Sequence, residues 1–254
     1  MRLLIEVSYD GGAFHGWQIQ PNAHTVQEEL EVALSRVLKT KIGIHGSSRT
    51  DTGVHAKQQF AHFDIDQETE LDLNHIIWKL NSALPQTIAV KGLWIISEEK
   101  HTRFDALYRK YIYRIHLQKN PFVIQNSFYF RKELDFEAMN NAAKELLQHQ
   151  DFQSFSKVKT EVNNFNCNIT EAKWMQSTDG WEFHISANRF LRGMVRAIVG
   201  TLFEVGLGKI DHVKFREIIE SRKRINAGSA AAAHGLTLEE VAYPSNYAED
   251  DKKN

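Results

Sequence analysis

The chain has 254 residues, of which 42% are apolar and 25% are charged, as is typical of a soluble globular protein with room for one large domain or two small ones. Its formal net charge of −1 does not by itself indicate a nucleic-acid partner. No apolar run approaches the roughly 18 residues of a membrane helix, the N-terminal segment becomes polar too early for a signal peptide, and Cys167, the only cysteine, excludes an internal disulfide. We therefore expect a cytoplasmic protein with no membrane contact.

The first part of the chain alternates strand and helix patterns. Thr25 and Glu28 have the spacing of a capping box and open a helix that is apolar on one face, and Pro85 ends a second helix. In chain order we expect a strand at 2–8, a helix at 25–38, strands near 41–45 and 54–64, a helix at about 72–83 and a strand at 87–96. The order βαββαβ is that of the ferredoxin-like fold.

The pattern recurs loosely in the second part. We expect a strand at 108–117, a helix capped by Asp135, a hairpin that turns at 177–180, a helix from about Phe190 to Val205, a short helix after Asp211 and a last strand at 235–243. The fold class predicted is α+β: two ferredoxin/RRM-like halves that form an extended, mostly antiparallel sheet, with helices on one side and a central catalytic cleft. We expect an N-terminal half at 1–104, a C-terminal half at 105–245 and a disordered tail at 246–254.

The basic residues are not spread evenly. They gather in three clusters that contain or adjoin aromatic residues. Phosphates bind to cations and unstacked bases stack on flat rings, so such clusters are suited to contact RNA. The candidate RNA contacts in these clusters are Arg103, Arg109, Lys110, Arg189, Arg192, Arg222, Lys223 and Arg224. Any one such run is also compatible with an ordinary solvated face.

The segment "SSRTDTGVHA" (47–56) concentrates reactive side chains in one loop. Asp51 is flanked by hydroxyls and followed by Gly53, which permits an unusual backbone angle, so it is a candidate nucleophile or base. Asp, Thr and Gly are equally common in plain turns. His55, with His45, His62 and Asp64, matches no compact metal-ligand spacing, so a metal site is disfavoured.

Two further segments carry candidate chemistry. In "RFDALYRKYIYRI" (103–115) strand alternation puts Arg109, Tyr111 and Tyr113 on one side, where they offer a cation and two rings, although half-buried tyrosines in a sheet are an alternative. In the helix predicted from Phe190, Arg192 and Arg196 are four residues apart and share a face. An arginine among apolar residues needs an anionic partner, which we expect to be a carboxylate or a phosphate.

Taken together, these segments resemble one family, the tRNA pseudouridine synthases of the TruA type. The similar segments are "YDGGAFHGWQIQPNAHTVQEELEVAL" (9–34), "SSRTDTGVHA" (47–56), "RFDALYRKYIYRI" (103–115), "NRFLRGMVRAIVG" (188–200) and "AGSAAAAHGLTLEEVAYP" (227–244). They occur in order over roughly residues 2–244.

The resemblance implies a reaction and its residues. Asp51 would be the essential aspartate, Tyr111 the tyrosine that packs against the target base, and Arg196 the arginine that pairs with the aspartate. We further hypothesise that Arg49 enters the RNA stem or fills the vacated space. The family isomerises uridine to pseudouridine in the anticodon stem-loop of tRNA, at expected positions 38, 39 and 40, on a flipped-out base. It acts as a homodimer and requires no cofactor or metal.

The sequence departs from the family pattern in four places. Ser48 and Thr52 stand where glycine and alanine are common, and Ala230 and Ala232 stand where threonine and proline are usual. A paralogue with another RNA target therefore remains an alternative. So do a non-catalytic RNA-binding protein with two RRM-like halves and a metal-dependent phosphohydrolase that uses the histidines.

Overall fold

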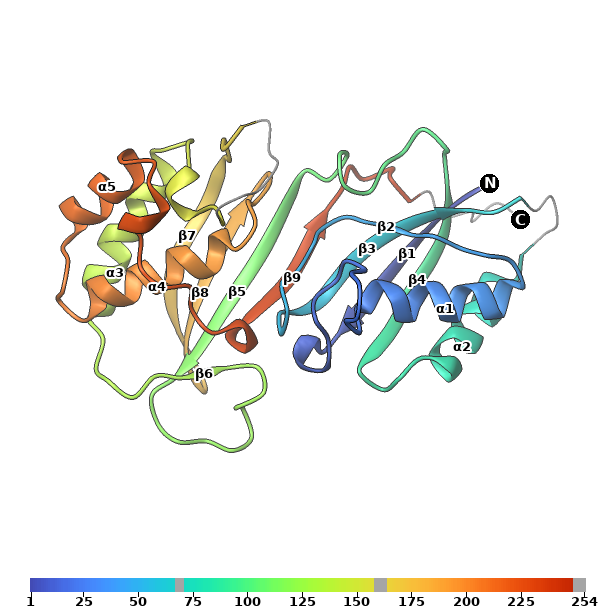
Figure 1. Ribbon diagram of the computed structural model, residues 1–254, viewed down its shortest axis with the longest axis horizontal. Coiled ribbons are helices and arrows are strands. Elements are labelled where there is room, and N and C mark those ends of the chain that lie inside the picture. Colours follow the sequence, from blue (N-terminus) through green and yellow to red (C-terminus); the bar gives the residue numbers. More distant parts are fainter. Residues whose placement is uncertain (67–70, 158–163, 249–254) are drawn as a thin grey trace. The chain divides into compact units, whose positions relative to one another are not determined.

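The computed structural model describes residues 1–66, 71–157 and 164–248, and the chain forms two compact units. One unit contains Met1–Leu107 and the chain from Leu238 onward, and the other contains Tyr108–Thr237 (Figure 1). The last strand is thus grouped with the first unit, although it follows the second along the chain. The boundaries expected for the two halves, 1–104 and 105–245, remain a prediction.

The first unit has the βαββαβ order predicted from the sequence. Its elements are β1 (Arg2–Tyr9), α1 (Val26–Leu38), β2 (His45–Gly46), β3 (His55–Asp64), α2 (Leu73–Ala83) and β4 (Ile88–Ile96). β1 pairs antiparallel with both β3 and β4, and β2 pairs antiparallel with β3. Both helices cover one face of these strands (Figure 1). The strand order β4-β1-β3-β2 is that of the ferredoxin-like fold.

Both helices of this unit begin where the sequence predicts. The Thr25 hydroxyl accepts a hydrogen bond from the Glu28 amide at 3.3 Å, and the Asp72 carboxylate accepts one from the His75 amide at 2.9 Å. Each bond satisfies an N–H group that the first helical turn leaves without a partner. The apolar stripe of α1, with Leu30 and Leu34 fully buried, faces the core.

The strand predicted near 41–45 is much shorter in the structure. Only His45 and Gly46 pair with β3. The amide of Ile42 instead donates to the Ser35 hydroxyl at 2.9 Å, and the amide of Ile44 donates to the Glu31 carboxylate at 3.0 Å. The backbone of 42–44 is therefore bonded to side chains of α1 rather than to a neighbouring strand, which corrects the prediction.

The edge of β3 that β2 leaves uncovered is next to β9 (Leu236–Ala242). The Val241 amide donates to the Gln58 side chain at 3.1 Å, and Lys57 pairs with Glu239. β2 covers β3 at residues 61–62, whereas these β9 contacts lie at residues 57–58. Two segments far apart in the sequence thus share one strand edge.

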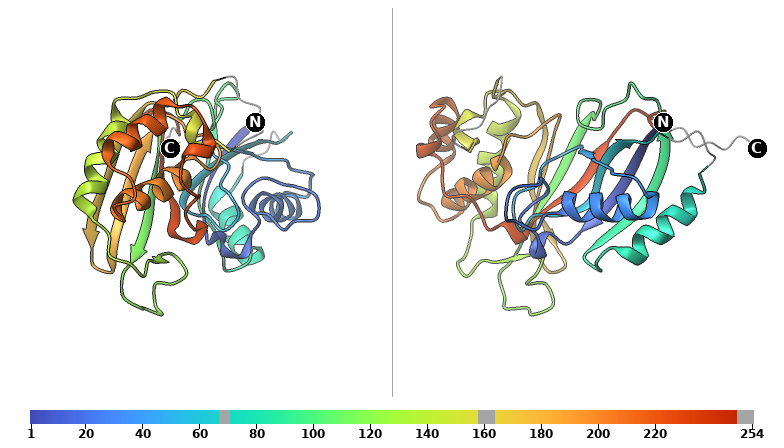
Figure 2. Two further views of the ribbon diagram at one scale, coloured as in Figure 1. Left: turned by 60° about the vertical axis from the view of Figure 1, so that its left-hand side comes forward. Right: turned by 45° about the vertical axis from the view of Figure 1, so that its right-hand side comes forward.

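The second unit has a three-stranded antiparallel core with helices on one face (Figure 2). Its elements are β5 (Tyr108–His116), β6 (Phe128–Tyr129), α3 (Phe136–Ala143), β7 (Ile169–Ser177), β8 (Gly180–Ala187), α4 (Met194–Gly206) and α5 (His212–Glu220). The strand order is β5-β8-β7, and β6 adds a short parallel pairing to β5. The hairpin of β7 and β8 turns at residues 177–180, and Asp135 and Asp211 cap α3 and α5, as predicted.

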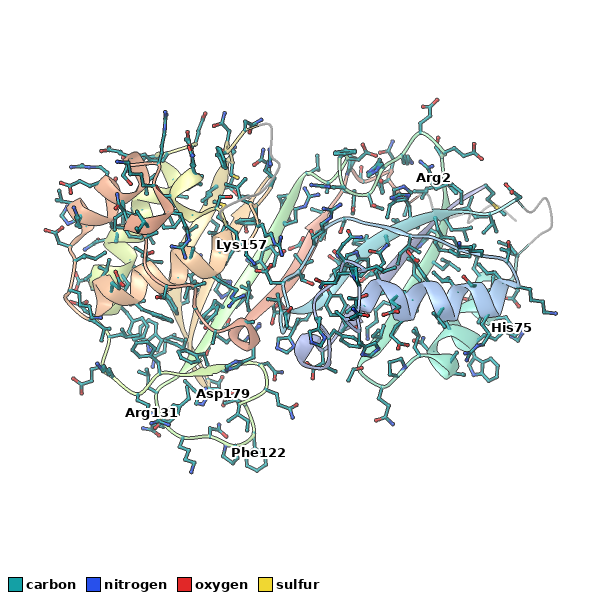
Figure 3. All side chains as sticks on the ribbon, in the orientation of Figure 1. Arg2, His75, Phe122, Arg131, Lys157 and Asp179 are labelled. Atoms are coloured by element: carbon teal, nitrogen blue, oxygen red, sulfur yellow. The ribbon has the colours of Figure 1, made fainter. Side chains whose placement is uncertain are left out.

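The segment between β5 and β6 is a long surface loop that carries exposed apolar side chains. Phe122 is 94% exposed, and Ile124 is also exposed. Arg131, which follows β6, lies over the Tyr129 ring at 5.6 Å from its centroid, and Figure 3 shows Phe122 and Arg131 outside the packed helices and strands. This loop contributes little to the core of its unit.

The predicted α+β class with mostly antiparallel strands is confirmed. Five of the strand pairings are antiparallel and the pairing of β5 with β6 is parallel. Within the described residues no helix is long and apolar enough to cross a membrane. Part of the predicted tail is described: Tyr247 is 4% exposed and stacks on Tyr243 at 4.2 Å. Residues 249–254 of that tail lie outside the described residues.

Candidate active site

The loop that contains Asp51 connects β2 to β3 and is packed against the segment that follows β1. The Trp17 amide donates to the Thr50 carbonyl at 3.1 Å, and the Gly53 amide lies 3.4 Å from the Phe14 carbonyl. Gly53 has φ +76°, and the Val54 amide donates back to the Asp51 carbonyl at 3.1 Å. Asp51 therefore begins a tight turn that glycine makes possible.

Two glycines let these segments approach each other. A Cβ on Gly16, which has φ +92°, would lie 2.7 Å from the Thr50 carbonyl oxygen. A Cβ on Gly11 would lie 2.0 Å from the Val54 carbonyl oxygen. Gly11 and Gly16 are therefore both needed for contact with the Asp51 loop.

The side chains of Arg49 and Asp51 project from this fixed backbone. Arg49 is exposed and Asp51 is half-buried, whereas Ser47 and Thr50 are buried. The loop thus presents a guanidinium and a carboxylate while the side chains of Ser47 and Thr50 point into the unit. An ionised carboxylate held in this way is suited to act as a nucleophile or base.

Two buried side chains that hold this loop were missed by the sequence analysis. Gln59 is fully buried: its amide oxygen accepts from the Ser47 hydroxyl at 2.8 Å, and its amide nitrogen donates to the Ser48 carbonyl at 2.7 Å. The hydroxyls of Tyr9 and Thr50 are 2.8 Å apart, and this contact is buried. In the sequence, Gln59 is recognisable only as an uncharged polar residue within a strand pattern. Such a residue can be either buried or exposed.

The histidines of β2 and β3 have different surroundings. His55 is buried, with its Nδ1 atom 3.1 Å from the Gly11 amide and 2.9 Å from an Asp10 carboxylate oxygen. His45 and His62 stack with their ring centroids 5.1 Å apart. Burial, followed by the nearby His101 ring, lowers the pKa of His62 to about 4.

Asp64 is paired with Arg2. Its carboxylate makes two hydrogen bonds of 2.8 Å with Arg2, and the bond to Arg2 lowers its pKa. Among the residues that the structure describes, no three histidine, cysteine, aspartate or glutamate side chains are placed to hold a metal ion. The metal-dependent alternative thus gains no support from the geometry.

In the second unit, β5 carries the predicted base-stacking residue. Tyr111 is 8% exposed and makes an edge-to-face contact with Phe190, with ring centroids 5.2 Å apart. Tyr113, two residues on, is fully buried, and burial raises its pKa. The structure therefore favours a core role for Tyr113 and leaves Tyr111 as the ring nearer the surface of β5.

The predicted arginine helix begins later than expected. α4 starts at Met194, and Gly193 before it has φ +70°. Because this left-handed residue interrupts the backbone, Arg192 precedes the helix, and the prediction that Arg192 and Arg196 share a helical face is wrong. The apolar residues Phe190 and Leu191 continue the apolar helical pattern on the N-terminal side of Met194, which is why the sequence predicts an earlier start.

Arg196 is held by the segment that precedes β9. Its Nε atom donates to the Ala231 carbonyl at 2.7 Å, and the Ala231 amide donates to the Arg196 carbonyl at 2.9 Å. The same segment approaches α4 closely at Gly200, where a Cβ would lie 1.7 Å from the Ser229 carbonyl oxygen. The guanidinium of Arg196 is thus oriented by backbone contacts inside its own unit.

Several candidate RNA-binding cations have partners within their own units. Lys110 pairs with Glu171 at 3.1 Å, and Arg222 pairs with Asp151 at 3.0 Å. Arg109 is buried and donates to the Asn188 carbonyl at 2.8 Å. Arg224 donates to the carbonyls of residues 227 and 228.

Four candidate cations remain. Arg103, Arg192 and Lys223 are exposed and Arg189 is half-exposed, with the Arg103 guanidinium 5.8 Å from the centroid of the exposed Phe104 ring. A role in RNA binding remains a prediction for all eight cations.

Comparison with known proteins decides the family. The family model described as tRNA pseudouridine synthase matches residues 5–108 and 142–244, which include the Asp51 loop and α4. The chain belongs to this family. It is 46% identical over 247 residues to tRNA pseudouridine synthase A of Porphyromonas gingivalis, covering 96% of this chain and 98% of that protein. It is 41% identical over 249 residues to tRNA pseudouridine synthase A of Bacillus subtilis, covering 96% of this chain and 99% of that protein.

Both matched ranges of the family model contain residues that the sequence analysis singled out. Asp51 and Arg49 lie in the first matched range and Arg196 lies in the second, whereas Tyr111 lies in neither. Each of these side chains lies on a segment fixed by contacts within its own unit. Family membership and local geometry thus rest on independent observations.

Proposed function

We propose that this protein isomerises uridine to pseudouridine in the anticodon stem-loop of tRNA, at positions 38, 39 and 40, with Asp51 as the nucleophile. The single observation that carries the proposal is the family match over both units, which includes the Asp51 loop. Relatives named tRNA pseudouridine synthase A align with nearly the full chain, and membership of this family makes the protein an isomerase of tRNA.

The chemistry requires few groups. The N1–C1′ glycosidic bond breaks, the uracil rotates, a C5–C1′ bond forms, and the C5 proton leaves while N1 gains one, so no atom is gained or lost. The Asp51 carboxylate either attacks C1′ to form an ester or assists elimination to a glycal. Arg196 supplies the positive charge that keeps a carboxylate ionised. Tyr111 stacks on the uracil and assists removal of the C5 proton.

The target uridine must leave its stack to reach these groups. Flipping a base costs a few kcal/mol, which contacts to the RNA backbone and stacking on a ring offset. Arg49, exposed at the tip of the Asp51 loop, fills the vacated space. We further propose that the protein acts in the cytoplasm, where its substrate is found, as a homodimer whose two copies together contact one tRNA.

Release of tritium from tRNA labelled at C5 of uridine tests the proposal. The unmodified protein should release tritium in the presence of a chelator, and Asp51→Asn should bind tRNA without releasing it. Release that persists in Asp51→Asn would exclude Asp51 as nucleophile, and a chelator-sensitive activity would favour the metal-dependent alternative. Binding without release by the unmodified protein would favour a non-catalytic RNA-binding role. Chemical mapping of pseudouridine then establishes whether positions 38–40 or another RNA is the target.

A further inference from the structure

Gln59 bridges the backbone on the N-terminal side of the Asp51 loop. Its side-chain amide is bonded at both ends, to the Ser47 hydroxyl at 2.8 Å and to the Ser48 carbonyl at 2.7 Å. Gln59 is 0% exposed and Ser47 is 2% exposed, so water has no access to replace the bonds at that hydroxyl. A buried polar group that loses its partner is costly, which keeps this bridge closed.

Tyr9 acts on the other side of Arg49. Its hydroxyl lies 2.8 Å from the Thr50 hydroxyl in a buried contact, while the Trp17 amide holds the Thr50 carbonyl. Gln59 lies on β3 and Tyr9 on β1, two strands paired with each other. Paired strands change their relative position little, so the bonds at residues 48 and 50 define the backbone from which Arg49 and Asp51 project.

We propose that Gln59 and Tyr9 are positioning residues for the isomerisation: they hold the loop so that Asp51 is aligned with C1′ of the flipped uridine. The inference rests on the proposed function of Asp51. Neither side chain reaches the substrate, and each acts through the loop backbone. A displacement of a reacting group by about 1 Å is sufficient to lower a rate on the order of 100-fold.

The competing explanation is that these bonds only stabilise the fold. The two explanations predict different results in a single-turnover assay with enzyme in excess. A loss of folded protein is overcome by adding more enzyme, so the plateau rate at saturating enzyme is unchanged. A misaligned Asp51 lowers that plateau rate whatever the enzyme concentration.

The matched variants are Gln59→Leu and Asn81→Leu. The Asn81 side chain makes the same kind of bridge, donating to the Val90 carbonyl at 3.0 Å and accepting from the Val90 amide at 2.8 Å, but between α2 and β4. Asn81→Leu should lower Tm and leave the plateau rate of tritium release unchanged. Gln59→Leu should lower the plateau rate by about 10- to 100-fold, with Kd for tRNA within roughly twofold of the original.

Tyr9→Phe provides a second test if Gln59→Leu does not fold, because it removes one hydroxyl and preserves the ring. It should lower the plateau rate by about 10-fold. Gln59→Glu adds a signature that a purely structural role lacks. When protonated, its carboxyl can still donate to the Ser48 carbonyl, and when ionised it cannot, so its plateau rate should fall with rising pH along a titration absent from the original protein.

The outcomes separate this inference from the proposed function. Unchanged plateau rates in folded Gln59→Leu and Tyr9→Phe, with Asp51→Asn inactive, would overturn the positioning role and leave the function of Asp51 intact. Activity that survives in Asp51→Asn would overturn both. Reduced plateau rates in both variants, against an unchanged rate in Asn81→Leu, would support the proposal.

Discussion

Gly200→Ala should destabilise the second unit strongly, although alanine is the better helix former. The new Cβ would lie 1.7 Å from the Ser229 carbonyl oxygen and 3.3 Å from the Ala231 amide. Both are backbone atoms, so no side-chain rotation relieves the overlap. The segment at 228–231 would have to move by more than 1 Å, which would disturb the bond from the Gly228 amide to the Thr201 hydroxyl, now 2.9 Å, and both bonds between Ala231 and Arg196.

The expected magnitude follows from these contacts. Overpacking of a filled site costs about 1–3 kcal/mol, and each of the hydrogen bonds contributes about 1 kcal/mol. The helix propensity of alanine returns at most about 1 kcal/mol. With all three hydrogen bonds lost, we therefore expect the free energy of unfolding to fall by about 3–5 kcal/mol. The rate of tritium release should fall further than the loss of folded protein accounts for, since Arg196 loses its orientation.

Urea denaturation followed by circular dichroism measures the first effect. Gly43→Ala is the matched control because a Cβ on Gly43 meets nothing within 4 Å and its φ is not positive. That control should change stability by less than about 0.5 kcal/mol. If Gly200→Ala is as stable as Gly43→Ala, the close approach of the 228–231 segment to α4 is not a constraint and the reasoning fails.

Three further predictions concern stability, reactivity and turnover. Burial lowers the pKa of His62 to about 4, so as the pH falls the unfolded chain takes up the His62 proton before the folded protein does. The free energy of unfolding should therefore decrease between pH 6.5 and pH 4, by roughly 2 kcal/mol at pH 5. In urea titrations His62→Gln should show a smaller decrease over the same range. Cys167 is 2% exposed and burial raises its pKa to about 11, so a thiol reagent at pH 8 should label it only after denaturant is added, and rapid labelling of the native protein would contradict its burial. Arg49→Ala should leave Tm within about 2 °C, because the side chain is exposed, and lower turnover on folded tRNA; unchanged kinetics would remove Arg49 from the proposed role.

Local sequence patterns predicted the elements whose boundaries depend on local bonds. Thr25, Asp72 and Asp211 cap helices because their side chains reach amides three residues ahead. The patterns failed where contacts with other segments determine the backbone conformation. Ile42 and Ile44 alternate with polar residues as in a strand, yet their amides bond to side chains of α1.

The sequence supplied candidate reacting groups for the site, whose roles stay predictions, but not the residues that support them. Asp51, Tyr111 and Arg196 belong to segments that resemble a family, so their residue types were informative. Gln59 and Tyr9 were missed because their roles arise only when β1 and β3 pair and bring both residues to the Asp51 loop. A polar residue inside a strand pattern does not reveal which backbone group it will meet.

Both units fix their candidate catalytic residue in the same physical way, by bringing a backbone segment against a glycine. Gly16 meets Thr50 and the turn at Asp51, and Gly200 meets the segment that bonds Arg196. The four departures from the family pattern lie beside these contacts. Thr52 and Ala230 are exposed, Ala232 is half-exposed, and Ser48 contributes its carbonyl rather than its hydroxyl to the Gln59 bridge. Because a substitution that spares the glycine contacts leaves the backbone in place, these departures are compatible with the proposed reaction, whereas a side chain at Gly16 or Gly200 is not.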